Sequence, residues 1–360
     1  MAIECVMPGG KGGGEVAQRL LEFGGDWNCL RPWRSRRGHT MMTLNVAPSP
    51  GARPRLMNVR VENAQSTMEY DEWKYFDDAV VEEALPEQRL WADLVSQGCG
   101  WNLPDAMSVT VIQQQTMLRS GNATISMNGL RTANRSRPIW DTTNFPIPLV
   151  HSDFSFDYRE ILESRRRGIP LDDAQIREAT RQCVREIELI TQGTRGSYTY
   201  GGGTIYGLTN HPDKISKVIT SPTASGWTPQ TTYDEILDAL QALQDVYFNR
   251  NVRAYYSPGW TKYLNTHFTP AYNAGTLRQQ LGAVDGISGW VKLDELPGYQ
   301  IILVETNKRT IRCINGMPLK TIQWGSHGDF QFNYKVVGIM VPQIRSNANG
   351  NTGIVHMAPA

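Results

Sequence analysis

Basic side chains are unevenly distributed along this 360-residue chain. Between Trp27 and Val61 there are seven arginines and neither aspartate nor glutamate. A guanidinium group binds a carboxylate or a phosphate through two parallel hydrogen bonds. Such a segment therefore needs an anionic partner, either neighbouring carboxylates or nucleic-acid phosphates. The arginines are Arg31, Arg34, Arg36, Arg37, Arg53, Arg55 and Arg60.

Two further polar stretches are rich in arginine. Residues 106–145 hold two β-like runs, 108–117 and 123–127, separated by the turn-like residues 119–122, which predicts a long projecting hairpin. The triplet 165–167 fits either a solvated surface or a positive patch between subunits. The candidate contacts to a neighbouring subunit or to DNA are Arg31, Arg34, Arg36, Arg37, Arg53, Arg55, Arg119, Arg131, Arg135, Arg137, Arg165, Arg166 and Arg167.

Catalytic motifs are absent from the sequence. The six histidines are never closer than 29 residues, so no local metal-binding spacing occurs. There is no GxSxG nucleophile motif. The glycine clusters at 9–14 and 201–203 lack the context of a phosphate-binding loop, and flexible linkage is the simpler interpretation. We therefore expect no enzyme, no catalytic or metal-binding residues and no cofactor.

The composition is that of a globular protein with little net charge. The formal net charge is +1, whereas a dedicated nucleic-acid-binding protein usually has a clear basic excess. The five cysteines are scattered, the closest two 24 residues apart, which favours buried thiols in a reducing compartment. No apolar run approaches the roughly 20 residues that cross a bilayer. The glycine-rich N-terminus does not resemble a signal peptide, so we expect neither secretion nor a membrane partner.

The elements that must position these residues are mixed helices and strands. Residues 1–68 read as an extended arm, with a short helical pattern at 15–23 and little other periodicity. Helical spacing follows at 71–84 and again at 90–95. The strongest helix is predicted after Pro170, and Gly193 lies where that helix should end. Its apolar positions are Ile176, Ala179, Cys183, Ile187 and Ile190.

A second unit begins near residue 200. A capping box from Thr232 to Glu235 predicts the start of another helix. Strands are predicted at 253–257 and 300–305, and the last fifty residues return to strand-like alternation. The fold class is therefore α+β.

Several sequence stretches resemble a known family. In chain order they are Asp71-Glu72-Trp73-Lys74, Ile147-Pro148-Leu149-Val150-His151-Ser152-Asp153-Phe154, Ser164-Arg165-Arg166-Arg167-Gly168, Tyr206-Gly207-Leu208-Thr209-Asn210-His211-Pro212, Gly316-Met317-Pro318 and Val341-Pro342-Gln343-Ile344-Arg345. From residue 69 to the C-terminus the chain resembles tailed-phage major capsid proteins of the Hong Kong 97-like fold, in the branch related to encapsulins. The arm is longer than encapsulins carry, which favours a phage capsid.

The resemblance implies a division into named parts. Residues 1–68 would be an N-terminal arm, and residues 106–145 an extended loop that lies over a neighbouring subunit. The peripheral domain, with the long spine helix, and the axial domain would make up the rest. The peripheral domain would comprise 69–105, 146–198 and 318–360, and the axial domain 199–317.

The implied function is a self-assembling icosahedral shell around the genome of a tailed double-stranded DNA phage. The implied partners are copies of the chain itself in pentamers and hexamers, packaged double-stranded DNA, and portal, scaffolding and decoration proteins. The implied location is the virion, with host cytoplasm before assembly. The alternatives are an encapsulin-type nanocompartment and, more remotely, a soluble nucleic-acid-binding protein acting through its basic arm.

Overall fold

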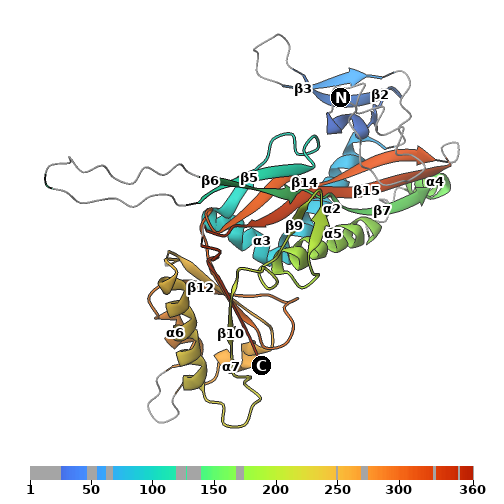
Figure 1. The fold of residues 1–360 in the computed structure, drawn as a ribbon. Helices are drawn as coiled ribbons and strands as arrows, with labels where there is room; N and C mark the ends of the chain where they lie inside the picture. Colours follow the sequence, from blue (N-terminus) through green and yellow to red (C-terminus); the bar gives the residue numbers. More distant parts are fainter. Residues whose placement is uncertain are drawn as a thin grey trace. The chain divides into compact units, whose positions relative to one another are not determined.

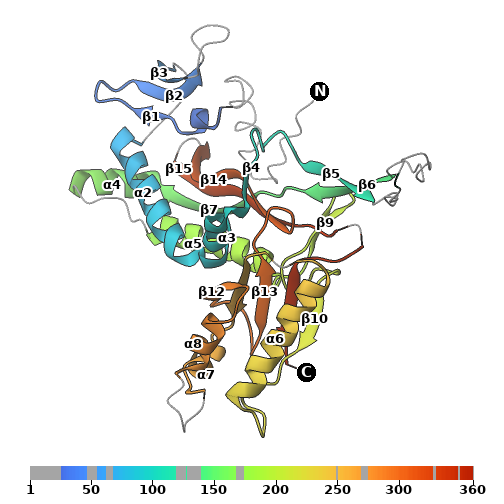
Figure 2. The same cartoon turned by 90° about the vertical axis from the view of Figure 1, so that its left-hand side faces the viewer.

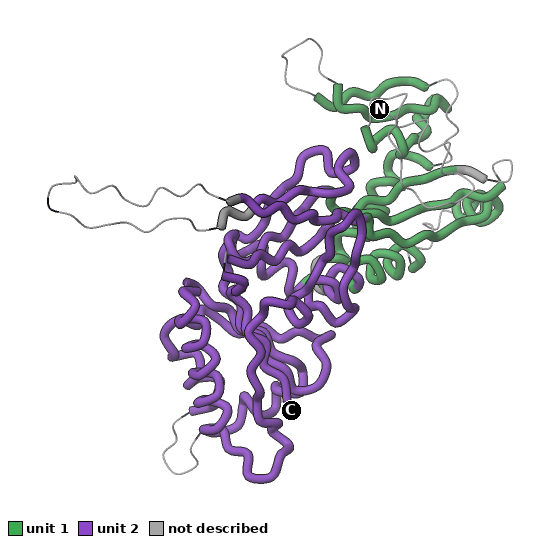
Figure 3. The backbone as a smooth tube through the Cα atoms, in the orientation of Figure 1, with its two compact units in different colours: residues 1–88, 149–185, 317–339 green, residues 89–148, 186–316, 340–360 purple. Residues whose placement is uncertain are grey.

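The structure is a computed structural model that describes residues 26–46, 55–61, 68–118, 127, 139–167, 174–248, 250–268, 275–326, 330–347 and 349–359. The chain divides into two compact units (Figure 3). Unit 1 comprises residues 1–88, 149–185 and 317–339, and unit 2 comprises residues 89–148, 186–316 and 340–360. Among the described helices, none has the length and apolar character needed to span a membrane.

The N-terminal arm contains a small sheet, which corrects the expectation of little regular structure. After the short helix η1 (Trp27–Leu30), the strands β1 (Trp33–Arg34), β2 (Thr40–Val46) and β3 (Arg55–Arg60) pair antiparallel in the order β1-β2-β3 (Figure 2). The apolar positions Met42 and Leu44 of β2 are buried, so the sheet has one packed face. The helical pattern expected at 15–23 lies outside the described residues.

Helix α2 (Tyr70–Glu87) supplies an aromatic face to the core of unit 1. Its carboxylate Glu72 accepts the backbone N–H of Glu69 at 2.7 Å, which fixes the start of the helix. Trp73 and Phe76 pack edge-on against Tyr334. Tyr334 lies on the long strand β15 (Gln331–Ile344), which pairs antiparallel with β7 (Val150–Asp157). The predicted helix over 71–84 is confirmed.

The helix predicted after Pro170 is also confirmed. Helix α5 (Ala174–Gln192) has 19 residues and is therefore about 28 Å long. Four of its five predicted apolar positions are buried, Ile176 and Ile187 fully, whereas Ile190 is half-buried. Gly193 follows the last turn with φ +92°, a left-handed conformation that ends the helix. The shorter helix α4 (Tyr158–Arg167) precedes it.

The described strands within residues 106–146 form a two-stranded ribbon in unit 2. Strand β5 (Val111–Leu118) pairs antiparallel with β6 (Ile139–Pro146), from Val111 opposite Pro146 to Leu118 opposite Ile139 (Figure 1). The first predicted strand is confirmed. The described partner of β5 is 139–146 rather than 123–127, and that second run, like the predicted turn at 119–122, lies outside the described residues. Strand pairing over this span depends on register, which local composition does not specify.

A five-stranded sheet forms the core of the rest of unit 2, in the order β10-β16-β13-β11-β12. The predicted strands near 253–257 and 300–305 are both found in it. Helices α6 (Pro229–Asp245), α7 (Trp260–Leu264) and α8 (Leu277–Gly282) pack their apolar faces against it (Figure 2). The strands are β10 (Ile215–Val218), β11 (Val252–Tyr256), β12 (Ile287–Lys292), β13 (Ile301–Glu305) and β16 (Ile354–Ala358).

Helix α6 begins earlier than its predicted capping box. Its N-cap is Thr228, whose hydroxyl accepts the N–H of Thr231 at 3.3 Å, and Pro229 occupies the first helical position. Thr232 is instead buried within the helix, where its hydroxyl accepts the indole N–H of Trp227 at 2.8 Å. Thr228 and Thr232 are both residues of the type that caps helices. Pro229 favours Thr228 as the N-cap, because proline is preferred at the first helical position.

The remaining elements connect these parts. Helix α3 (Arg89–Leu94) runs into a π-helical turn (Val95–Cys99) and then into β4 (Gly100–Asn102). Strand β4 pairs in parallel with β14 (Ile311–Ser326), in a sheet of order β4-β14-β15-β7. The hairpin of β8 (Tyr198–Tyr200) and β9 (Gly203–Ile205) contains the predicted glycine cluster.

Candidate functional site

Arg31 joins the N-terminal arm to helix α2. Its guanidinium donates two hydrogen bonds to the two carboxylate oxygens of Asp77, at 2.9 and 2.5 Å. The same group lies 4.8 Å from the ring centre of Trp73, and the indole N–H of Trp73 donates to the Pro32 carbonyl at 2.9 Å. A bidentate pair with a stacked guanidinium is a well-ordered contact. For this arginine, the anionic partner is therefore a carboxylate of its own chain.

Three other candidate arginines of the arm point to solvent. Arg34 is also exposed, but its backbone N–H donates to the Met68 carbonyl at 2.8 Å, which tethers β1 next to the start of α2. Arg36, Arg37 and Arg55 are exposed, and none forms an ion pair with a described carboxylate. These three side chains are free for an external anion, which is the chemistry that their clustering predicted. Arg53 lies outside the described residues.

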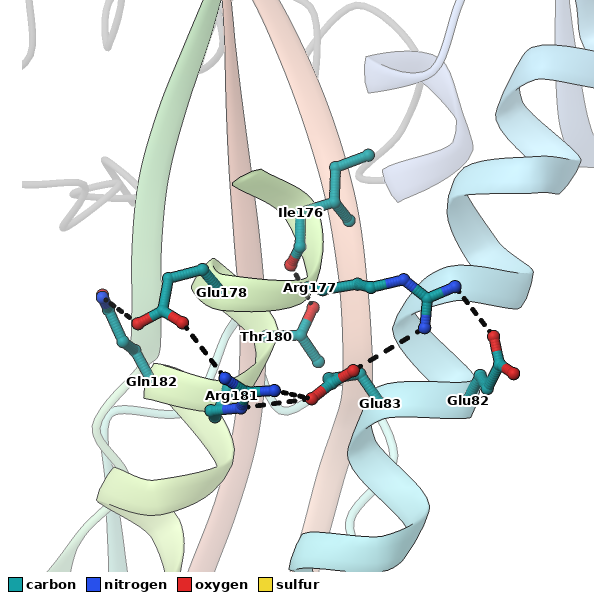
Figure 4. Close-up of polar contacts among 8 residues, drawn as sticks. All are labelled: Glu82, Glu83, Ile176, Arg177, Glu178, Thr180, Arg181 and Gln182. Carbon is teal, nitrogen blue, oxygen red and sulfur yellow. Dashed lines mark hydrogen bonds and ion pairs between the residues drawn. The ribbon is translucent and has the colours of Figure 1, made fainter. Parts of the chain in front are cut away.

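A network of ion pairs links α2 to α5 in unit 1 (Figure 4). Arg177 of α5 pairs with Glu82 at 2.8 Å and with Glu83 at 3.7 Å. Arg181, one turn later, binds the same Glu83 at 2.6 Å. Glu83 is only 14% exposed, so two guanidinium groups neutralise a largely desolvated carboxylate. Sequence reasoning missed this network, whose signal is the Arg-x-x-x-Arg spacing on one helix face.

The arginine triplet and the loop arginines are not brought together by the described structure. Arg167 pairs with Glu163 at 2.5 Å across one turn of α4, and both Arg166 and Arg167 are exposed. The side chain of Arg165 is not described. The four loop candidates lie outside the described residues, namely Arg119, Arg131, Arg135 and Arg137.

The glycine cluster at 201–203 packs against strand β6. The Asn144 side chain of β6 donates to the Gly201 carbonyl at 3.1 Å. A Cβ at Gly203 would lie 2.2 Å from the Asn144 carbonyl oxygen, so only glycine fits there. Gln343 donates to Gln114 of β5 at 2.8 Å on the same unit. The expectation of simple flexible linkage at 201–203 is therefore corrected, because these glycines permit close backbone packing.

A buried carboxylate caps helix α3. Glu188 of α5 is 4% exposed and accepts the backbone N–H groups of Leu90 and Trp91 at 3.3 and 3.0 Å. Burial raises the pKa of Glu188 to about 7, while these hydrogen bonds act in the opposite direction. Nearby, Arg253 pairs with Asp93, which also accepts the Tyr255 hydroxyl at 2.8 Å. These polar contacts position α3 against the core of unit 2.

Two thiols and two imidazoles of the described structure are buried or half-buried. Burial raises the pKa of the Cys99 thiol to about 11 and that of Cys313 well above its usual value. Burial lowers the pKa of His211 and of His356. Within the described part of the chain, no group of three or more histidine, cysteine, aspartate or glutamate side chains could hold a metal ion. What the described arrangement offers is a set of charged and apolar contact surfaces.

Solved structures with similar folds are shell proteins. The chain is similar to the virus-like particle from Pyrococcus furiosus, with a TM-score of 0.55 and 13% identity over 80% of this chain and 98% of that chain. It is similar to the capsid of Myoviridae phage XM1, with a TM-score of 0.58 and 12% identity over 73% and 90%. It is also similar to the capsid of the native GTA particle, with a TM-score of 0.52 and 10% identity over 72% and 88%.

These similarities establish the architecture. The chain has the Hong Kong 97-like major capsid fold that its motifs predicted. No curated protein matches the sequence. The family described as "Family of unknown function (DUF6260)" matches residues 63–357, which is most of the chain. The protein therefore belongs to that family.

Proposed function

We propose that this protein is the major capsid protein of a tailed double-stranded DNA phage and assembles into the icosahedral shell around its genome. The observation that carries the proposal is the similarity of fold to three shell proteins, which extends over 72% to 80% of the chain. The capsid of phage XM1, with the highest TM-score of the three, supports the phage role. The role is structural rather than enzymatic.

The extended loop and the arm supply the kind of contact that a shell needs. Strands β5 and β6 form a two-stranded ribbon, which is marginal as an isolated structure in water. Trp140 on β6 is 57% exposed, so a large aromatic side chain of this ribbon is available to a neighbouring subunit. Segments that become ordered on docking allow reversible contacts early in assembly and a stable shell later.

We also propose the division into capsid domains that the sequence resemblance implied. The proposed peripheral domain comprises 69–105, 146–198 and 318–360, and the proposed axial domain comprises 199–317. Helix α5 is the proposed spine helix, and 106–145 is the proposed loop over a neighbour. These boundaries stay a prediction.

Packaged double-stranded DNA is the proposed second partner. Arg36, Arg37 and Arg55 have the exposed guanidinium groups that phosphate contact requires. A net charge of +1 fits an inner wall that holds DNA without binding it tightly. Portal, scaffolding and decoration proteins are further proposed partners. The virion is the proposed location, with host cytoplasm before assembly.

An encapsulin-type compartment is the second candidate. The observation that favours it is the similarity to the Pyrococcus furiosus virus-like particle, which extends over 98% of that chain. Terminase and portal genes beside the coding gene support the phage role, whereas a cargo-enzyme gene supports a compartment. DNA in particles purified from their natural source would give the same distinction.

The test is expression of the full chain alone, followed by size-exclusion chromatography and electron microscopy. Closed particles of uniform diameter are the expected result. A chain that stays monomeric across a range of protein and salt concentrations, and also in the presence of scaffolding protein from the same source, contradicts the proposal.

A further inference from the structure

Four basic side chains gather in unit 2 where β13 leads into β14 and where β15 ends. The backbone N–H of Arg345 donates to the Thr310 carbonyl at 2.8 Å, which holds Arg345 beside the β13–β14 connection. The Arg312 Nε donates to the Lys308 carbonyl at 3.2 Å, so these two residues also lie together. The group, here the basic cluster, consists of Lys308, Arg309, Arg312 and Arg345.

The basic cluster has no counter-ion among the described carboxylates of its own chain. None of its members forms an ion pair with a described carboxylate, and the Nε of Arg345 is buried without a hydrogen-bond partner. Burial and the nearby charges of Arg312 and Arg309 lower the pKa of Arg345. The nearby Glu305 is buried and accepts the Thr310 hydroxyl at 2.8 Å. Mutual repulsion between the cations therefore remains until an external anion arrives.

Unit 2 also has an acidic surface whose carboxylates form no ion pair with a described cation. Asp234, Asp238 and Asp245 are exposed on one face of α6, at helical spacing. Asp234 and Asp245 accept only side-chain amides, at 2.7 and 2.8 Å, and no described cation pairs with any of the three. The surrounding sequence, 218–249, contains four acidic residues and neither lysine nor arginine. We name Asp234, Asp238 and Asp245 the acidic stripe.

We propose that the acidic stripe of one copy docks against the basic cluster of the next copy around a capsid ring. The two surfaces carry opposite charges, and no described ion pair joins them within one chain. A contact between two different patches is heterologous, and its repetition closes a ring when the rotation allows it. The proposal rests on the proposed shell function and names the surfaces that join neighbouring subunits within a ring.

Carboxylates of a second copy fit the basic cluster better than phosphates do. The chain itself presents an unpaired acidic face at the concentration that assembly demands, and α6 is a rigid element that can hold its carboxylates at fixed spacing. Arg312 and Arg345 are partly buried, so bidentate contact to a carboxylate is less screened there than at the open surface. Lys308 and Arg309 are exposed and reach outward from the cluster.

Charge reversal and charge exchange test the proposal. One variant carries Lys308→Glu with Arg309→Glu, a second carries Asp234→Lys with Asp238→Arg, and a third combines all four substitutions. All substituted side chains are exposed, so the variants should keep the thermal unfolding temperature of the wild-type subunit. Lys217→Glu, at an exposed cation on β10, is the matched control and should assemble normally.

Each reversed pair should lower the yield of particles about tenfold or more, because like charges then face each other at every repeat of the interface. The combined variant should recover most of the wild-type yield, since its charges are opposite again. If both reversed variants assemble with the wild-type yield, or if the combined variant does not regain particle yield, this inference is overturned and the proposed function is not. Reversed cations that assemble normally but lose bound DNA would assign the basic cluster to phosphate and also overturn it. A wild-type chain that never assembles overturns the proposed function instead.

Discussion

Arg31 and Asp77 form a bidentate ion pair across 46 residues of sequence, with the arginine 16% exposed and the aspartate 45% exposed. The Arg31 guanidinium also lies over the Trp73 ring, so the arm contacts α2 through an ion pair and an aromatic side chain. The Arg31–Asp77 pair therefore anchors the basic arm to helix α2 of the same chain. Arg36 and Arg37, a few residues further along the arm, form no ion pair with a described carboxylate.

Removing the anchor should loosen the arm. Asp77→Asn removes the charge and one acceptor while keeping the side-chain shape, and should cost about 1 kcal/mol because the pair is only partly desolvated. Limited trypsin digestion of the unassembled subunit should cut near Arg34 to Arg37 faster than in the wild type. Asp78→Asn is the matched control, because Asp78 is exposed one position away and has no described partner. Equal cleavage rates for both variants would show that the pair does not hold the arm.

Glu188 should give the subunit a pH-dependent stability. Its pKa rises from 4.5 to about 7 on folding, so the native state binds more protons than the unfolded state between these values. The free energy of unfolding contributed by this group therefore falls as pH rises from about 4.5 to about 7, by up to about 3 kcal/mol.

Glu188→Gln keeps an acceptor for the N–H groups of α3 and removes the titration. Urea unfolding of the unassembled subunit at pH 5, 6, 7 and 8 should show a smaller loss of stability with rising pH in the variant than in the wild type. Parallel pH profiles for the two proteins would mean that Glu188 stays charged throughout.

The contact between Gly203 and Asn144 predicts intolerance to a single methyl group. Gly203→Ala would place a Cβ 2.2 Å from a backbone carbonyl that cannot rotate away, so β9 must move from β6. We expect a destabilisation of about 1–3 kcal/mol, measured by thermal unfolding of the subunit. Gly282→Ala is the control, because no atom lies within 4 Å of its added Cβ and its φ is not positive. A Gly203→Ala variant as stable as the control would contradict this packing.

The mature shell should be held together without covalent links between chains. Residues 106–145 contain no lysine and no cysteine, so the loop offers neither an amine for an isopeptide bond nor a thiol for a disulfide. Its arginines stay protonated and cannot act as nucleophiles. Outside the loop, Lys335 is largely buried and pairs with Asp153 at 3.2 Å. Boiled particles on a denaturing gel should give one band near 40.4 kDa, and a ladder of multimers would overturn the prediction.

Local patterns in the sequence determined the helices and much of the candidate chemistry. The stripe from Ile176 to Ile190 and the terminal Gly193 specify α5 because helical periodicity and capping act within a few residues. The concentration of arginine in the arm likewise needs no structure to be recognised. The resemblance to capsid proteins could be recognised from the sequence because it depends on the order of motifs along the chain.

Tertiary structure alone decided which distant residues meet. Nothing in the sequence near Arg31 points to Asp77, and nothing near Glu83 points to Arg177 and Arg181. Strand register pairs β5 with 139–146, and backbone packing brings Gly203 into close contact with Asn144. Such contacts are chosen by the shape of the packed core, in which each side chain takes the partner that folding brings within reach, whereas periodicity reports only on neighbours three or four residues away.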